Sequence, residues 1–239
     1  MSAETVKGSK PSVLEDFVDI LYQPAAVFER RRETVAFGLA MVLLTVLSAV
    51  VFFATKSGFD PVLDVMVKQQ AAEILRANPA LTPEQLAGST GMMKGGIIGT
   101  MLAYPLIIPF LAGLLMWVIG KFFDSKLAIG AAVMVATYSY VPRFIGFIVA
   151  SLMAVLLPED QITSFFSISL SPARFLDPAT HSIGVMSLLA RLDLFLIWQT
   201  VIAGVGISVL GGVSRGRGMT VAILVWLLGF IPLIPALLK

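Results

Sequence analysis

The chain has 239 residues, of which 57% are apolar and only 13% are charged. Soluble globular domains carry about 25% charged residues, so this composition excludes an ordinary soluble domain and predicts an integral membrane protein. A net charge of +2 gives no reason to expect nucleic-acid binding, and the absence of cysteine excludes disulfides, thiolate metal sites and cysteine nucleophiles.

Residues 1–33 predict a cytoplasmic N-terminal segment that contains an amphipathic helix over Pro11–Tyr22. On one side of this helix we expect Val13, Leu14, Phe17, Val18 and Leu21, and on the other side Glu15, Asp16 and Asp19. The helix would rest on the protein's own cytoplasmic face or lie in the membrane interface. Pro24 suits the first turn of a second short helix over Pro24–Glu33. No cleavable signal peptide is indicated, because residues 1–33 are mostly polar.

The first predicted span covers residues 34–54 and follows the run Glu29-Arg30-Arg31-Arg32-Glu33. Three arginines at a membrane boundary mark the cytoplasmic side. A lipid-binding basic patch is the alternative, although the two flanking glutamates weaken it.

A polar loop, Lys56–Lys94, is expected on the opposite side of the membrane. It predicts a helix over Pro61–Asn78, followed by a second helix with Thr82 as its N-cap and Gln85 at the third helical position. This helical external loop would cover the bundle or bind a partner.

The second predicted span covers residues 95–119. Small residues recur every four positions at Gly91, Gly95, Gly99 and Ala103, and such faces let membrane helices approach closely, within one chain or in a homodimer. Tyr104, Pro105 and Pro109 interrupt the regular helix inside this span.

The third predicted span, residues 127–157, is apolar for about 30 residues and carries Tyr138, Tyr140, Pro142 and Arg143 in its middle. Proline bends a helix, and an arginine at the bilayer centre costs at least ~2.5 kcal/mol. The segment is therefore one bent span facing other helices, or a re-entrant hairpin of two half-helices.

A fourth span is expected over 192–210, with Asp193, Trp198 and Gln199, and a fifth over 219–238. Gly204, Ser208 and Gly212 form a second row of small residues. The short basic connections, 121–126 and 214–218, belong on the cytoplasmic side with residues 1–33. This predicts an all-α, five-helix transmembrane bundle with its N-terminus inside and its C-terminus outside.

Three segments resemble the Yip1 family of five-span membrane proteins, especially its bacterial members. They are Asp19–Phe28, DILYQPAAVF; Ala136–Pro142, ATYSYVP; and Leu192–Gln199, LDLFLIWQ, followed by Gly204 and Gly206. Ser139 stands where the family commonly has glycine. The resemblance implies a Yip1-like domain over residues 34–239, a bacterial inner-membrane location and an adaptor role. Eukaryotic relatives act in membrane traffic and associate with small GTPases, but the family's long cytoplasmic N-terminal region is missing here.

No catalytic, cofactor-binding or metal-binding residues are predicted, because the sequence has no G-x-S-x-G, H-E-x-x-H or P-loop motif and His181 is its only histidine. We therefore expect a non-enzymatic scaffold whose partners are the lipid bilayer and other membrane proteins or a second copy of itself.

The alternative function is a small permease or channel. It would use the broken third span, with Tyr138, Tyr140, Pro142, Arg143 and Gln199 as a polar cluster. A structural role for Arg143 is the competing interpretation: it would bind carbonyls freed by Pro142, bind Gln199, or reach an interface. A third hypothesis is interfacial lipid binding through residues 11–28.

Overall fold

The computed structural model describes residues 12–177 and 180–231, and all regular structure in these ranges is helical. The α-helices are α1 (Val13–Asp19), α2 (Pro24–Arg30), α3 (Gly38–Ala54), α4 (Lys56–Ala77), α5 (Pro83–Ala87), α6 (Thr90–Lys121), α7 (Ile129–Ser139), α8 (Val141–Leu156), α9 (Ile183–Ala190), α10 (Leu194–Gly211) and α11 (Arg215–Leu228). Three short 3₁₀ turns, η1 (Glu159–Gln161), η2 (Phe165–Ile168) and η3 (Pro172–Phe175), connect α8 to α9.

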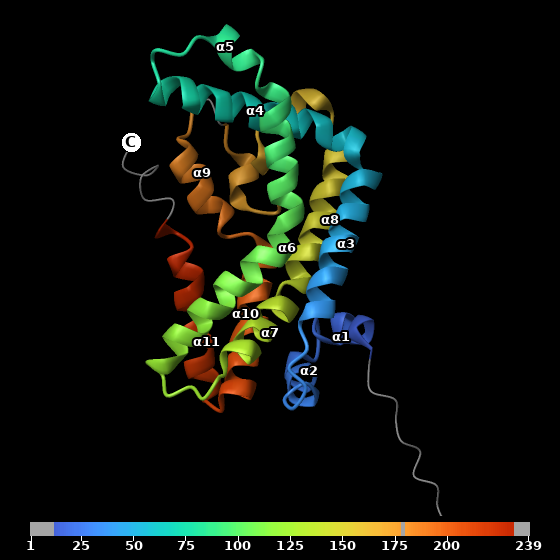
Figure 1. Ribbon diagram of the computed structural model, residues 1–239, viewed down its shortest axis with the longest axis vertical. Coiled ribbons are helices and arrows are strands. Elements are labelled where there is room, and N and C mark those ends of the chain that lie inside the picture. Colours follow the sequence, from blue (N-terminus) through green and yellow to red (C-terminus); the bar gives the residue numbers. More distant parts are fainter. Residues whose placement is uncertain (1–11, 178–179, 232–239) are drawn as a thin grey trace, which may run out of the picture.

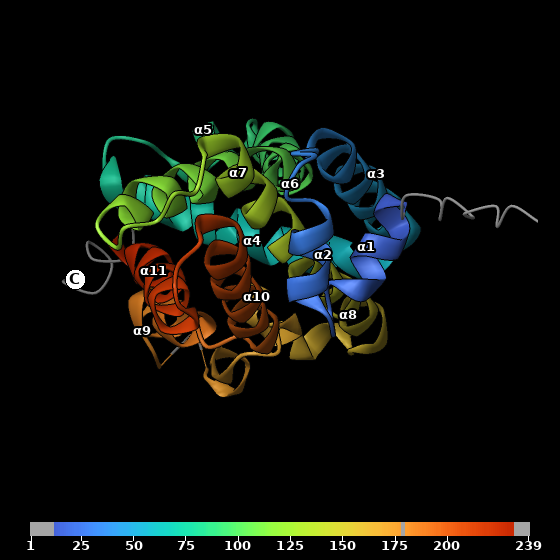
Figure 2. The same ribbon diagram turned by 90° about the horizontal axis from the view of Figure 1, so that it is seen from below.

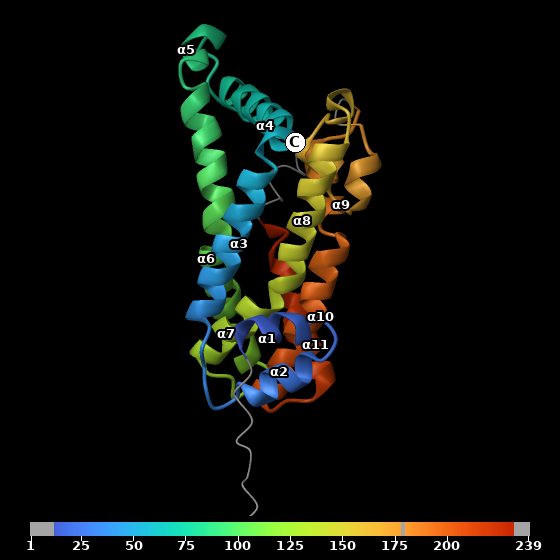
Figure 3. The same ribbon diagram turned by 90° about the vertical axis from the view of Figure 1, so that its right-hand side faces the viewer.

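The helices form an elongated bundle with two different ends (Figures 1 and 3). At one end, which we call the α2 end, lie α1, α2, and the α6–α7 and α10–α11 connections. At the other, the α4 end, lie α4 and α5. Helices α3, α6 and the pair α7–α8 run between the two ends, whereas α10 and α11 occupy only the half near α2, with α9 above them.

Three helical segments are long and apolar enough to cross a membrane: Thr90–Lys121, Ile129–Leu156 and Leu194–Gly211. The pair α3–α4, bent by 93°, raises the number of candidate spans to four in the part of the chain that the structure describes. Helix α11 has 14 residues, fewer than the ~20 that a span needs, and residues 232–238 of the predicted fifth span lie outside the described residues. The protein is multi-pass, and a count of five spans stays a prediction.

The predicted third span is one bent span rather than a hairpin. Helices α7 and α8 meet at Tyr140 and together form a candidate span of 28 residues. Pro142 lies in the first turn of α8, where a helix has no use for the backbone N–H that proline lacks. The chain therefore continues towards the α4 end after Pro142 (Figure 3).

The polar segment between the first two spans is helical, as predicted. The capping box is confirmed: the Thr82 side chain accepts from the Gln85 N–H, and the Gln85 side chain accepts from the Thr82 N–H at 2.9 Å. Helix α4 begins at Lys56, earlier than the expected Pro61, directly after the turn that ends α3. Lys94 of α6 pairs with Asp60 at 3.1 Å and with Asp64 at 2.9 Å, which ties α6 to α4.

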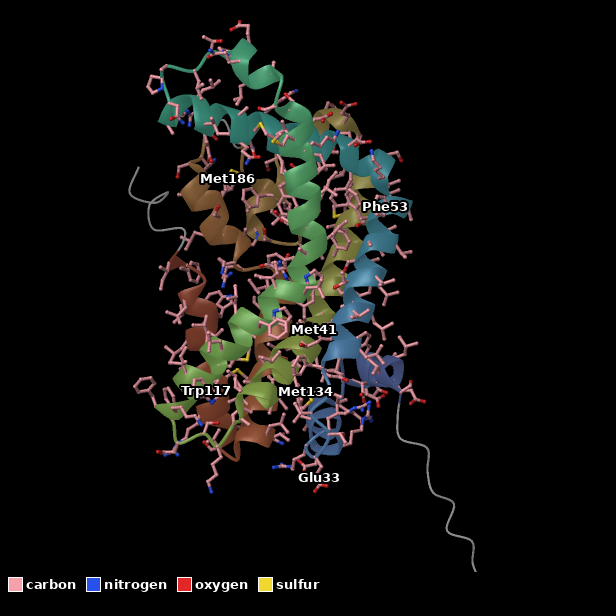
Figure 4. The ribbon with its side chains drawn as sticks, viewed as in Figure 1. Glu33, Met41, Phe53, Trp117, Met134 and Met186 are labelled. Carbon is pink, nitrogen blue, oxygen red and sulfur yellow. The ribbon has the colours of Figure 1, made fainter. Side chains whose placement is uncertain are left out.

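Two separate apolar cores stabilise the bundle. The α2-end core gathers residues of α1, α2, α7 and α10, including Phe28, Met134 and Ile202, and the α4-end core gathers residues of α3, α4 and α8, including Phe59 and Ala154. Figure 4 labels Met134 and Trp117 towards the α2 end, and Phe53 and Met186 towards the α4 end. The middle of the bundle therefore lies between the two cores.

Candidate functional site

The N-terminal helices are fixed to the bundle through one fully buried carboxylate, that of Asp16. Nε of Arg30 donates to it at 2.7 Å and Nε of Arg31 at 2.6 Å, and Arg30 adds a second bond through Nη2. The hydroxyl of Tyr138, on α7, donates to the same carboxylate at 3.4 Å. A buried carboxylate needs such partners, because burial removes its hydration.

The orientation of α1 differs from the expected one. Asp16 was placed on the solvent side but is buried beside Phe17, whereas Leu14 and Val18, expected on the packed side, are 57% and 59% exposed. The reason is the arginine pair that begins at Arg30, which gives the Asp16 carboxylate charged partners inside the protein. On the exposed side, hydrogen bonds from Tyr22 and then Arg30 lower the pKa of Asp19.

Helix α2 docks against α10 through a close contact. Phe28 is fully buried, and a Cβ placed on Gly206 of α10 would lie 2.7 Å from its ring. Only glycine leaves room for the ring there. Arg32 adds a hydrogen bond to the carbonyl of Val209 at 3.0 Å. Arg32 thus also ties α2 to α10, and α2 lies beside α10 in the view onto this end (Figure 2).

Four further polar side chains lie beyond the α2 end, and we call them the mid-bundle cluster: Tyr104 of α6, Tyr140 at the α7–α8 junction, Arg143 of α8 and Arg191, which ends α9. Tyr140 also belongs to the α2-end core. The rings of Tyr104 and Tyr140 are 6.2 Å apart.

Arg191 is held against α11. Its Nη2 donates to the Trp226 carbonyl at 2.6 Å, and the Trp226 indole N–H donates back to the Arg191 carbonyl at 3.3 Å. The guanidinium carbon lies 5.7 Å from the Trp226 ring centroid and 5.2 Å from that of Phe230. Gly229 makes this approach possible, since a Cβ there would lie 2.3 Å from Nη2 of Arg191.

Four of the five residues of the predicted polar cluster lie at the α7–α8 junction, and two of their side chains have different neighbours. Tyr138 donates to Asp16, whereas the ring of Tyr140 lies near that of Tyr104. Gln199 lies partly buried on α10, and its side chain makes no hydrogen bond to a described residue. The Arg143 side chain likewise makes no hydrogen bond within the described ranges, neither to Gln199 nor to a carbonyl near Pro142.

Sequence reasoning did not predict Arg191, Asp16 or Tyr104 as site residues. Arg191 directly precedes the predicted fourth span, 192–210, and this position was a signal that it could lie near membrane depth. Asp16 gave no such signal, because its partners on α2 and α7 are distant in the sequence.

The two rows of small residues have different surroundings. In the second row, Gly204 lies against Met219 of α11, and Gly218 lies against the Gly204 carbonyl and Ser208. Gly212 ends α10 in the left-handed conformation, with φ of 65°. In the first row, a Cβ at Gly91, Gly95 or Gly99 would meet no described atom within 4 Å, and Ala103 is partly buried.

The Yip1 domain family model matches residues 18–235, which is nearly the whole chain. The chain belongs to the Yip1 domain family. Searches of the curated proteins and of the solved structures found no match. The resemblance in the three sequence segments is therefore confirmed.

These three segments meet in the Yip1 domain. The Asp19–Phe28 segment brings Phe28 onto Gly206, which follows the Leu192–Gln199 segment, and Tyr138 of the Ala136–Pro142 segment donates to Asp16, just before the matched region. Across residues 12–177 and 180–231, the Yip1-domain protein has no group of three or more histidine, aspartate or glutamate side chains able to hold a metal ion.

Proposed function

We propose that this Yip1-domain protein is a non-enzymatic scaffold of the bacterial cytoplasmic membrane that associates with other membrane proteins. The observation that carries the proposal is the free surface of α6. Only 22% of an 18-residue apolar stretch of α6 is buried inside the protein, the lowest share among the three candidate spans. Its first row of glycines faces open space, and large apolar side chains such as Ile107 and Leu111 are 53% and 54% exposed.

In a membrane, an apolar helix face gains little by association unless a partner packs closely against it, and small residues allow that close packing. Helix α6 has both an open row of glycines and a long exposed face, so it offers a second membrane helix a surface that the rest of this chain leaves uncovered.

The proposed orientation places the N-terminus inside and the C-terminus outside. It is supported by the basic residues gathered at the α2 end: the Arg30–Arg32 run, Lys121 and Arg217, the last of which pairs with Asp124 at 3.2 Å across two connections. Positive charge in short connections faces the cytoplasm.

Single cysteines test the scaffold proposal, because the chain has none of its own. Gly99→Cys and Ile107→Cys should form disulfide or bifunctional thiol cross-links to a second copy or to another membrane protein in native membranes. Ala132→Cys, buried in the α2-end core, is the control that should not. Gly99→Leu should abolish association without lowering the protein level, whereas Gly88→Leu, also in open space but at the end of α5, should not. Failure of both exposed cysteines to cross-link anything would contradict the proposal.

A further inference from the structure

Helix α1 turns apolar side chains outward and a carboxylate inward. Leu14 and Val18 lie one helical turn apart and are 57% and 59% exposed, whereas Asp16 is fully buried. Phe17, on the inner side with Asp16, packs against Tyr138 with 6.1 Å between the ring centroids. A surface helix that faces water normally has its carboxylates outside and its apolar residues inside. The outer side of α1 therefore has the character of a surface that faces a medium less polar than water.

The row of exposed apolar residues continues past the end of α1. Tyr22 follows Val18 by four residues, is 62% exposed, and its hydroxyl donates to Asp19 at 2.7 Å. A tyrosine combines an apolar ring with a polar tip, and such side chains are enriched where a membrane meets water. We call Leu14, Val18 and Tyr22 the α1 outer row.

Helix α1 adjoins the start of α3, whose outer surface is apolar. Phe17 of α1 and Ala40 and Leu44 of α3 belong to the same core, and α1 lies beside the start of α3 in two views (Figures 1 and 3). The exposed residues of α3 carry no polar side chain: they are Gly38, Leu39, Val42, Val46, Val50, Phe53 and Ala54. In a multi-pass protein such a surface faces lipid. The lipid-facing surface of α3 therefore begins at the level of α1.

The α2 end has further marks of a membrane surface. The Arg30–Arg32 run follows α1 in the sequence, and at the end of α6 Phe122 is 81% exposed and directly follows Lys121. Helix α1 runs across the long axis of the bundle, as a helix in the membrane plane does (Figures 1 and 3). Glu15 is exposed and Asp19 partly exposed, and these carboxylates need water. They therefore place α1 in the headgroup layer rather than in the hydrocarbon core.

We propose that α1 is an interfacial anchor, with the α1 outer row buried in the membrane leaflet at the α2 end. The occupant of this surface is lipid, because the row adjoins the lipid-facing surface of α3. Residues 13–19 include no lysine or arginine, so the contact is apolar and does not require an anionic lipid. The inference is independent of the scaffold function, since it concerns α1 rather than the exposed face of α6.

The test measures the membrane depth of single fluorescent probes on the full-length protein, which has no cysteine of its own. Leu14→Cys and Val18→Cys would carry an environment-sensitive fluorophore in phosphatidylcholine nanodiscs that hold one copy each. A nitroxide-labelled phosphatidylcholine quenches the probe, and it carries the nitroxide near the headgroup in one sample and near the chain end in another. Val46→Cys, exposed in the middle of α3, is the control for deep lipid. Glu33→Cys, exposed at the tip of the α2 end, is the control for water (Figure 4).

We expect the probes at Leu14 and Val18 to lose more fluorescence to the headgroup nitroxide than to the chain-end nitroxide, because interfacial helices sink their apolar face only about 5–10 Å. The probe at Val46 should show the reverse preference, and the probe at Glu33 the smallest loss. A loss at Leu14 and Val18 no greater than that at Glu33 would overturn the proposal. Blue-shifted emission at Leu14 and Val18 without quenching by either nitroxide would overturn it as well, because protein rather than lipid would then cover the row.

Discussion

At the residue scale, the carboxylate of Asp16 is central to how the N-terminal helices are held against the bundle. It is fully buried and joins α1 to α2 and α7 through Arg30, Arg31 and Tyr138. The pattern of α1 alone could not predict this, because a carboxylate on an amphipathic helix normally faces water. The partners lie 14, 15 and 122 residues further along the chain, so only the tertiary structure shows that they meet.

Asp16→Asn keeps the size of this side chain and removes its charge, which leaves two arginines facing a neutral amide. Breaking a buried ion pair costs about 3–5 kcal/mol, and the partial exposure of Arg30 favours the lower end of that range. We expect the protein to unfold at a lower temperature in detergent, and trypsin to cleave faster within the Arg30–Arg32 run.

Asp19→Asn is the matched control for this substitution. Asp19 pairs with the same Arg30 at 2.7 Å, but its side chain is 27% exposed, so water and salt screen this pair and its loss should destabilise the fold much less. Equal destabilisation by the two substitutions would show that burial of the Asp16 carboxylate does not matter.

At the scale of the elements, local sequence patterns predicted where helices begin and bend better than they predicted which residues pack against them. The capping box at Thr82 and the tyrosine–proline junction of the third span could be read from neighbouring residues, because caps and proline act over one helical turn. The glycine row of α6 predicted close packing, but the pattern does not identify the partner, and the structure leaves that row without a described neighbour.

Gly206 tests how α2 is held against α10. Gly206→Ala adds one methyl group that would lie 2.7 Å from the Phe28 ring, so the ring must move and α2 must shift. Overpacking of this kind costs about 1–3 kcal/mol. The unfolding temperature should fall, and the rate of tryptic cleavage within Arg30–Arg32 should rise.

Gly38→Ala is the control, since Gly38 begins α3 in open space and alanine favours the helix. If Gly206→Ala were as stable as Gly38→Ala, the contact between Phe28 and α10 would not hold the N-terminal helices in place.

At the scale of the whole molecule, hydropathy predicted a membrane protein and the approximate position of most spans, but it did not show how far each helix extends. Helix α10 begins and α11 ends about halfway along the bundle (Figure 1), and two hydrogen bonds between Arg191 and Trp226 join the turn before α10 to α11. Hydropathy averages over such a turn, so it did not show that α10 begins halfway along the bundle.

The topology follows from which connections share an end of the bundle. Cysteines at Asp124 and Ser214 lie in the two connections at the α2 end, and cysteines at Ser57 and Ser182 lie beyond α3 and before α9. Asp124, with 82% of its side chain exposed, is a better labelling site than Ser125, which is 5% exposed. With the N-terminus inside, an impermeant thiol reagent should label Ser57→Cys and Ser182→Cys in intact cells, and Asp124→Cys and Ser214→Cys only in inverted membranes.

Labelling of Ser214→Cys from outside would mean that an odd number of crossings separates it from the N-terminus. Protection of Ser57→Cys from both sides would instead mean that α3 and α4 form one broken span within the bilayer, since an exposed serine is shielded only if lipid covers it.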